Sequence, residues 1–169
     1  MPADERALAG LREAILTEHT GRDFYAVASE RTADPKGKEV FLVLSSEEAR
    51  HEEQLKSQYA AIAAGRDPMP SVRAGSAAAL DGDSPIFSAE LRNRIAGAHW
   101  EMTALSVGLQ LELNTIARYR ELAATAGLPE LQTFYEELVR WEEGHARALE
   151  RQLKLLREDY WQEAGFTPF

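Results

Sequence analysis

Hydrophobic side chains recur every three or four residues along most of the chain, and no segment alternates polar and apolar residues with a period of two. This period is typical of amphipathic helices and does not support strands. Proline and glycine gather between the periodic segments, where they end one helix and begin the next. We therefore expect four helices, over about residues 4–31, 35–65, 88–127 and 129–157.

The lengths of the intervening segments predict how these helices are connected. Short loops join the first helix to the second and the third to the fourth, whereas residues 66–87 form a long crossover rich in proline, glycine, serine and aspartate. Asp34 followed by Pro35 is typical of a helix N-cap and first turn. The chain is therefore expected to be one all-α domain, a four-helix bundle with one crossover. The aromatic tail, residues 158–169, is expected to cover an end of the core or a dimer seam.

The two halves of the chain repeat. Sliding the sequence against itself by 94 residues aligns nine identical pairs between Leu11 and Gln58 and their partners. The matches include two glutamates and a histidine in each half, with the same spacings of 30 and 3 residues. A repeat kept only for packing would retain apolar residues and let polar ones change. We infer two helical hairpins related by a pseudo-two-fold axis.

The repeated glutamates and histidines lie within the apolar stripes of their helices, where a core is expected. An unpaired carboxylate in a core is costly, and several together repel unless cations hold them. Glutamate and histidine three positions apart share one helix face, so both can reach the same ion. Such mixed oxygen and nitrogen donors suit two Fe ions, or Mn or Zn. The alternative is a bundle that keeps these side chains in a wet cavity. The six candidate ligands are Glu18, Glu48, His51, Glu112, Glu142 and His145.

Four acidic residues next to these motifs, Glu47, Glu52, Glu53 and Glu143, lie off the stripes, and we expect each of them on a solvated face.

Other polar and aromatic residues near the motifs are weaker candidates. His19 and His99 point away from the ligand faces of their helices, and Trp141 is expected to pack beside its neighbouring ligand. Tyr25 and Tyr119 each follow a ligand glutamate by seven residues on the same face. Each is either a core aromatic whose hydroxyl needs some partner, or a donor that orients a metal-binding carboxylate of the other half.

Composition excludes several functional classes. The 169 residues contain no cysteine, which excludes disulfides, thiol catalysis and iron–sulfur ligation by this sequence. The net charge of −9 disfavours nucleic acid and anionic membranes as partners. No apolar run approaches the ~20 residues of a membrane helix, and the first residues, MPADERALAG, do not resemble a secretory signal. A cytoplasmic protein is expected.

The sequence resembles the rubrerythrin family of the ferritin-like superfamily. The stretches that carry the resemblance are TEHTGRDFYAVASE with SSEEARHEEQL, and QLELNTIARYRELA with VRWEEGHARAL. The resemblance implies a dinuclear site, usually iron, that reacts with hydrogen peroxide or dioxygen. It also implies that Glu48 and Glu142, or their hairpin partners, bridge the metals, with His51 and His145 on one metal each. Homodimers or larger homo-oligomers are common in this class.

Two features depart from the family pattern. Rubrerythrins proper carry a rubredoxin domain with four cysteines, and this sequence has none, so electrons are expected from an external donor protein. Rubrerythrins also tend to have a further glutamate one turn after the third-helix ligand, where this chain has Thr115. Two functions are therefore weighed: an oxidoreductase that reduces peroxide or dioxygen, and an iron-handling protein without efficient turnover.

Overall fold

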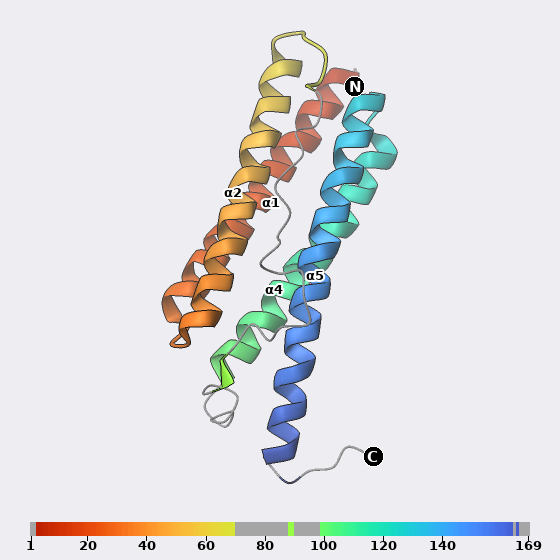
Figure 1. The fold of residues 1–169 in the computed structure, drawn as a ribbon. Helices are drawn as coiled ribbons and strands as arrows, with labels where there is room; N and C mark the ends of the chain where they lie inside the picture. Colours follow the sequence, from red (N-terminus) through yellow and green to blue (C-terminus); the bar gives the residue numbers. More distant parts are fainter. Residues whose placement is uncertain (1–2, 70–87, 90–98, 164, 166–169) are drawn as a thin grey trace.

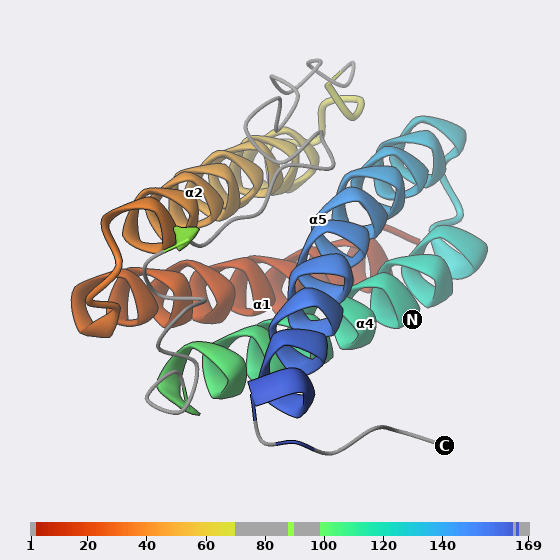
Figure 2. The same cartoon turned by 60° about the horizontal axis from the view of Figure 1, so that its bottom comes forward.

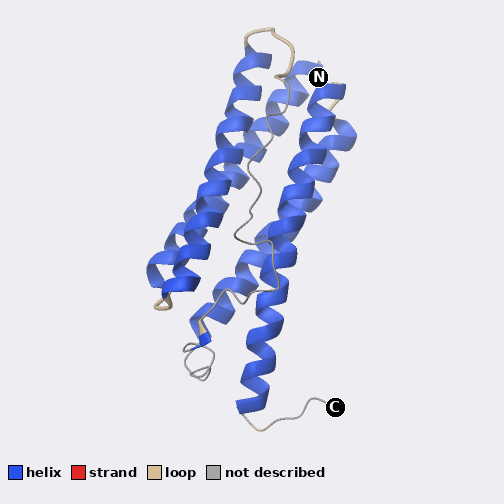
Figure 3. Ribbon diagram, in the orientation of Figure 1, coloured by secondary structure: helices blue, strands red, loops and turns tan. Residues whose placement is uncertain are grey.

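The computed structural model describes residues 3–69, 88–89, 99–163 and 165, which form long helices and no strand (Figure 3). The all-α prediction is therefore confirmed. The expected crossover, beyond residue 69, and the expected early turns of the third helix, residues 90–98, lie outside the described residues. The described helices are α1 (Ala3–Arg31), α2 (Pro35–Ala63), α4 (His99–Thr125) and α5 (Pro129–Glu163).

The turn between α1 and α2 is organised by Asp34, the residue that the sequence predicted as an N-cap. Its Oδ2 accepts a hydrogen bond from the backbone N–H of Gly37 at 2.9 Å, and Pro35 occupies the first turn, where no N–H is needed. The same carboxylate also accepts hydrogen bonds from the backbone N–H and the hydroxyl of Ser88. Asp34 therefore starts α2 and also binds Ser88, which comes before the second hairpin in the sequence.

The helix ends agree with the sequence pattern except at the last helix. Gly65 and Gly127 follow α2 and α4 with φ of 66° and 72°, a left-handed conformation that glycine adopts without strain. The expected end of the fourth helix near residue 157 is wrong, because α5 continues to Glu163. Tyr160 explains the extension: it packs against the core and meets His99 edge-on, with ring centroids 6.4 Å apart. Residues 166–169 of the expected aromatic tail lie outside the described part of the chain.

The helices form two antiparallel hairpins, α1 with α2 and α4 with α5 (Figure 1). The hairpins lie against each other with α1 beside α4, which the view turned by 60° also shows (Figure 2). Among the described helices, none combines the length and the hydropathy that crossing a bilayer requires.

The apolar core is split into two clusters that lie at opposite ends of the bundle. Every helix contributes to both, because its apolar stripe is interrupted in the middle by the polar residues of the repeat. The first cluster contains Tyr25, Phe41, Leu44, Leu105, Leu149 and Leu156. The second contains Leu11, Leu55, Tyr119, Leu131, Phe134 and Leu138. The layer between them holds the candidate site.

Candidate metal centre

All six residues singled out by the repeat meet in the middle layer of the bundle. One glutamate comes from α1, one from α4, and a glutamate with a histidine one turn later comes from each of α2 and α5. A spacing of three residues places Glu and His on one helix face, so each pair projects into the same space. All six side chains are buried, with at most 3% of their surface exposed: Glu18, Glu48, His51, Glu112, Glu142 and His145.

The six residues divide into two overlapping groups of four. Within each group, ligand atoms lie within 4.8 Å of one another, close enough to surround one cation. Glu48 and Glu142 belong to both groups, so their carboxylates are placed to bridge two ions. The first group adds Glu18 and His51, and the second adds Glu112 and His145.

In both histidines, Nδ1 is the ring nitrogen that faces the four glutamates of the two ligand groups. Nδ1 of His51 lies 3.2 Å from Glu18 Oε2 and 3.0 Å from Glu142 Oε1. Nδ1 of His145 lies 3.0 Å from Glu142 Oε2 and 3.4 Å from Glu48 Oε1. Glu142 therefore contacts both rings, one with each oxygen, as a bridging carboxylate would.

Burial and mutual repulsion shift the ionisation of the whole cluster. Burial raises the pKa of Glu48 and of Glu112 well above the usual range, and the charge of Glu142 raises both further. Burial opposes a charge on His51, yet Glu142 and Glu18 raise the pKa of His51 to about 10. The two histidines in turn hold the pKa of Glu142 below its usual range, although burial acts the other way. Without bound cations, the cluster therefore holds protons on groups such as Glu48, Glu112 and His51 that cations would displace.

Two tyrosines hydrogen-bond to the cluster from the opposite hairpin. The hydroxyl of Tyr25 on α1 donates to Glu112 Oε1 on α4, and the hydroxyl of Tyr119 on α4 donates to Glu18 Oε1 on α1. Burial, followed by the charge of the accepting carboxylate, raises the pKa of both hydroxyls well above the usual value, so both stay protonated and remain donors. Each bond fixes one carboxylate and ties the two hairpins together.

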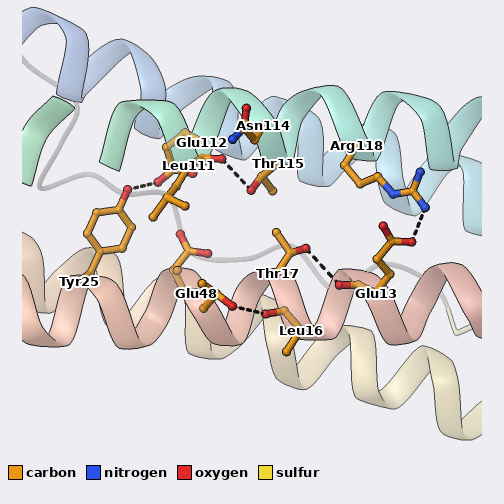
Figure 4. Close-up of a pocket in the computed structure, with 12 residues that line it drawn as sticks. Glu13, Leu16, Thr17, Tyr25, Glu48, Leu111, Glu112, Asn114, Thr115 and Arg118 are labelled. Atoms are coloured by element: carbon orange, nitrogen blue, oxygen red, sulfur yellow. Dashed lines mark hydrogen bonds and ion pairs between the residues drawn. The ribbon is translucent and has the colours of Figure 1, made fainter. Parts of the chain in front are cut away.

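A pocket of about 430 Å³ between α1 and α4 reaches the cluster from the surface (Figure 4). Glu48 extends into it from α2, and Tyr25 and Glu112 meet on one wall. Gly21 leaves space for Glu48, because a Cβ at this position would lie 3.3 Å from Glu48 Oε2. The hydroxyl of Thr115, on the pocket wall, donates to the carbonyl of Leu111 in its own helix at 3.0 Å.

The cluster fits cations better than a set of internal hydrogen bonds. Two of its buried oxygens, Glu48 Oε1 and Glu142 Oε1, lie 3.4 and 3.0 Å from a histidine Nδ1 but form no hydrogen bond of good geometry with any described residue. A buried carboxylate oxygen without a donor is costly, and a metal ion would satisfy both atoms. The oxygen and imidazole donor set is one that divalent iron, manganese and zinc accept.

The prediction that the four acidic residues next to the motifs lie on a solvated face is wrong for two of them, Glu47 and Glu52. Glu47 is 6% exposed, and its Oε2 lies 2.6 Å from Nε2 of His145, across the bundle. Glu52 is 4% exposed and pairs with Arg22 of α1 at 2.7 Å and with Lys56. The spacing of apolar residues in the sequence already indicated that Glu47 is buried. Glu47 lies three residues after Leu44 and four before His51, so it shares their side of the helix.

The remaining candidates lie outside the cluster, as expected. Glu53 is exposed, and Glu143 is partly exposed and pairs with Arg120 at 2.6 Å. His99 is exposed, and His19 is half-buried beside Glu52. Trp141 packs its indole parallel to the ring of His51, with centroids 5.1 Å apart.

These features define an all-α, ferritin-like four-helix bundle whose buried carboxylates and histidines form a candidate centre for two metal ions. The family model described as Rubrerythrin matches residues 10–110, so the chain belongs to the rubrerythrin family. No curated protein and no solved structure matches it significantly. The matched range contains Glu18, Glu48 and His51, whereas the other three cluster residues lie beyond it. The internal repeat and the fold bring those three to the same place.

Proposed function

We propose that this protein is a non-haem di-iron oxidoreductase that reduces hydrogen peroxide or dioxygen with electrons from an external donor protein. The observation that carries the proposal is the pair of overlapping ligand groups sharing Glu48 and Glu142. In this proposal Glu18, Glu112, His51 and His145 complete the two metal positions. Two ferrous ions would supply one electron each, the two that cleavage of the peroxide O–O bond requires.

The residues of the chain have distinct tasks in this proposal. Tyr25 and Tyr119 keep their protons and hold Glu112 and Glu18 in position through hydrogen bonds. The two apolar clusters keep bulk water away from the ligand groups at both ends of the bundle. The pocket between α1 and α4 gives a molecule as small as peroxide a route to Glu48 and Glu112.

A second function is supported by Thr115. The family tendency is a further glutamate at this position, but the Thr115 hydroxyl is bonded to its own helix and offers no carboxylate to the cluster. An iron-handling protein that binds metal without efficient turnover is the function this observation favours.

Single-turnover kinetics separates the two functions. Protein loaded anaerobically with Fe(II) is mixed with peroxide or with dioxygen in a stopped-flow instrument, and metal content is measured by elemental analysis. We expect about two metals per chain and rapid oxidation by one of the oxidants. Two bound iron ions that neither oxidant oxidises rapidly would support the iron-handling function.

Variants test the ligand assignment in the same assay. His51→Ala and His145→Ala should each lower metal content and abolish rapid oxidation, because the shared carboxylates couple the two positions. His99→Ala and Glu143→Ala are matched controls outside the cluster, and both should keep metal content and rate within a few-fold of the wild type. A control that empties the centre, or a ligand variant that leaves it intact, would show that the assignment is wrong.

We also propose that the chain forms a homodimer or larger homo-oligomer. Large apolar side chains are exposed on the described helices, including Leu16 at 65% and Leu42 at 50%. Analytical ultracentrifugation at micromolar concentration tests this, and a monomer at all concentrations would contradict it.

A further inference from the structure

The two histidines of the cluster lie in different surroundings, although the repeat relates them. The position before the ligand glutamate is Glu47 on α2 and Trp141 on α5, and these two positions are 94 residues apart. Each side chain reaches the histidine of the opposite hairpin. Glu47 contacts His145, and Trp141 stacks on His51. The pseudo-symmetry is therefore broken next to the ligands.

At His145, both ring nitrogens are engaged by carboxylates. Nδ1 faces Glu142, Glu48 and Glu112 at 3.0, 3.4 and 3.8 Å. Nε2 lies 2.6 Å from Oε2 of Glu47, and both residues are buried. Since a carboxylate accepts and does not donate, the contact with Glu47 requires a proton on Nε2. When a cation replaces the proton on Nδ1, the neutral ring keeps its proton on Nε2 and presents the Nδ1 lone pair to the cation.

At His51, the carboxylate contacts within the described residues involve Nδ1 alone. Trp141 lies against the face of the ring, with an interplanar angle of 10°. A ring stacked in this way is held in place, but stacking does not select which nitrogen carries the proton. Nor does it add electron density to the ring as a hydrogen-bonded carboxylate does.

We propose that Glu47 is a positioning residue. It fixes the Nε2–H tautomer of His145 and makes the metal position of Glu48, Glu112, Glu142 and His145 the tighter of the two. This inference rests on the proposed metal centre. It adds that the position containing His145 fills before the position containing His51. A carboxylate on the distal nitrogen of a metal-binding histidine typically changes metal affinity 10- to 100-fold.

Zn(II) titration by calorimetry tests the inference without any redox reaction. The wild type should bind two Zn(II) in two resolved steps, and His145→Ala should remove the tighter step whereas His51→Ala removes the weaker one. Glu47→Gln, which keeps the shape but not the charge, should weaken the tighter step about tenfold and change the weaker one less than twofold. Glu52→Gln alters another buried carboxylate of α2, one outside the cluster, and should leave both steps unchanged.

Two further measurements distinguish positioning from a general effect on folding. In the His145→Ala background, Glu47→Gln should have no additional effect on Zn(II) binding, since Glu47 acts through that ring. In ¹⁵N NMR of the Zn(II)-loaded protein, one histidine should show a protected Nε2–H proton that Glu47→Leu exposes to exchange. Equal weakening of both steps by Glu47→Gln, an unchanged NMR signal, or loss of the tighter step in His51→Ala would overturn the inference. A wild type that binds no Zn(II) or Fe(II) would instead overturn the proposed metal centre.

Discussion

The middle layer of the bundle and the two ends around it use the same four helices in opposite ways. The ends are built from fully buried side chains such as Phe41, Leu44, Leu131 and Leu149, whose burial stabilises the fold. The middle layer buries four carboxylates and two imidazoles, which lose hydration and repel one another in part. We infer that the apolar ends hold the bundle together and that the middle layer depends on cations for its stability.

Metal loading should produce the largest difference between these regions. Zn(II) at a thousandfold excess over the dissociation constant of a site should raise the free energy of unfolding by about 4 kcal/mol for that site, because the ion binds the folded cluster and not the unfolded chain. Urea denaturation of apo and loaded protein measures this. The double variant His51→Ala/His145→Ala should lose most of the gain. Denaturation curves that do not respond to metal would contradict the role assigned to the middle layer.

Truncation at an apolar end should have the next largest effect. Leu149 has no exposed surface and lies one turn after His145, so Leu149→Ala should lower the free energy of unfolding by about 3 kcal/mol. Metal should not offset the cavity, and the loss should be similar in apo and loaded protein. Leu113→Ala is the control, because Leu113 is 48% exposed, and it should change stability by less than about 0.5 kcal/mol. Equal losses in both variants would contradict the prediction.

Two stacked tyrosines, Tyr119 and Tyr135, allow a hydroxyl that is hydrogen-bonded to the middle layer to be compared with one that is not. Tyr119 donates to Glu18, whereas the buried hydroxyl of Tyr135, with its ring centroid 6.0 Å from that of Tyr119, has no hydrogen-bond partner among the described residues. Tyr119→Phe should cost about 2 kcal/mol, since it removes a bond to a charged acceptor. Tyr135→Phe should be close to neutral. Thermal denaturation of both variants measures the difference, and the reverse order would contradict it.

The pH dependence of the apo protein should be opposite in sign to that of the metal-loaded protein. The pKa of Glu48, Glu112 and His51 is raised in the folded cluster, so the folded state holds more protons than the unfolded chain above about pH 4.5. Stability of the apo protein should therefore fall as pH rises from about 5 to 9, by at least about 1.4 kcal/mol.

The fall in stability with rising pH should be reversed under two conditions, at lower pH and in the metal-loaded protein. Below about pH 5, protonation of Glu142, whose pKa is lowered, should reverse the trend. In the metal-loaded protein, stability should rise with pH, because metal binding releases the protons of its ligands. Melting temperatures across pH 4 to 9 in the presence and absence of Zn(II) measure both slopes, and parallel slopes would contradict the prediction.

The amino-acid pattern was sufficient to predict the helices, the hairpins and the members of the buried cluster. A glutamate such as Glu142, with Leu138 four positions before it and Ala146 four positions after it, is placed on the inward face of an amphipathic helix. The 94-residue repeat then pairs the two halves without knowledge of their contacts. The end of α5 was mispredicted because Tyr160 gains burial only from a neighbouring helix.

Contacts between the hairpins were decided by the tertiary structure. Helical periodicity states which face of a helix is inward, but it does not state how far two hairpins are rotated or shifted relative to each other. That arrangement determines that Tyr25 reaches Glu112, that Glu48 and Glu142 lie in both ligand groups, and that Glu47 reaches His145. Each of these contacts depends on distances of a few ångströms between side chains far apart in the sequence, and such distances follow from packing rather than from periodicity.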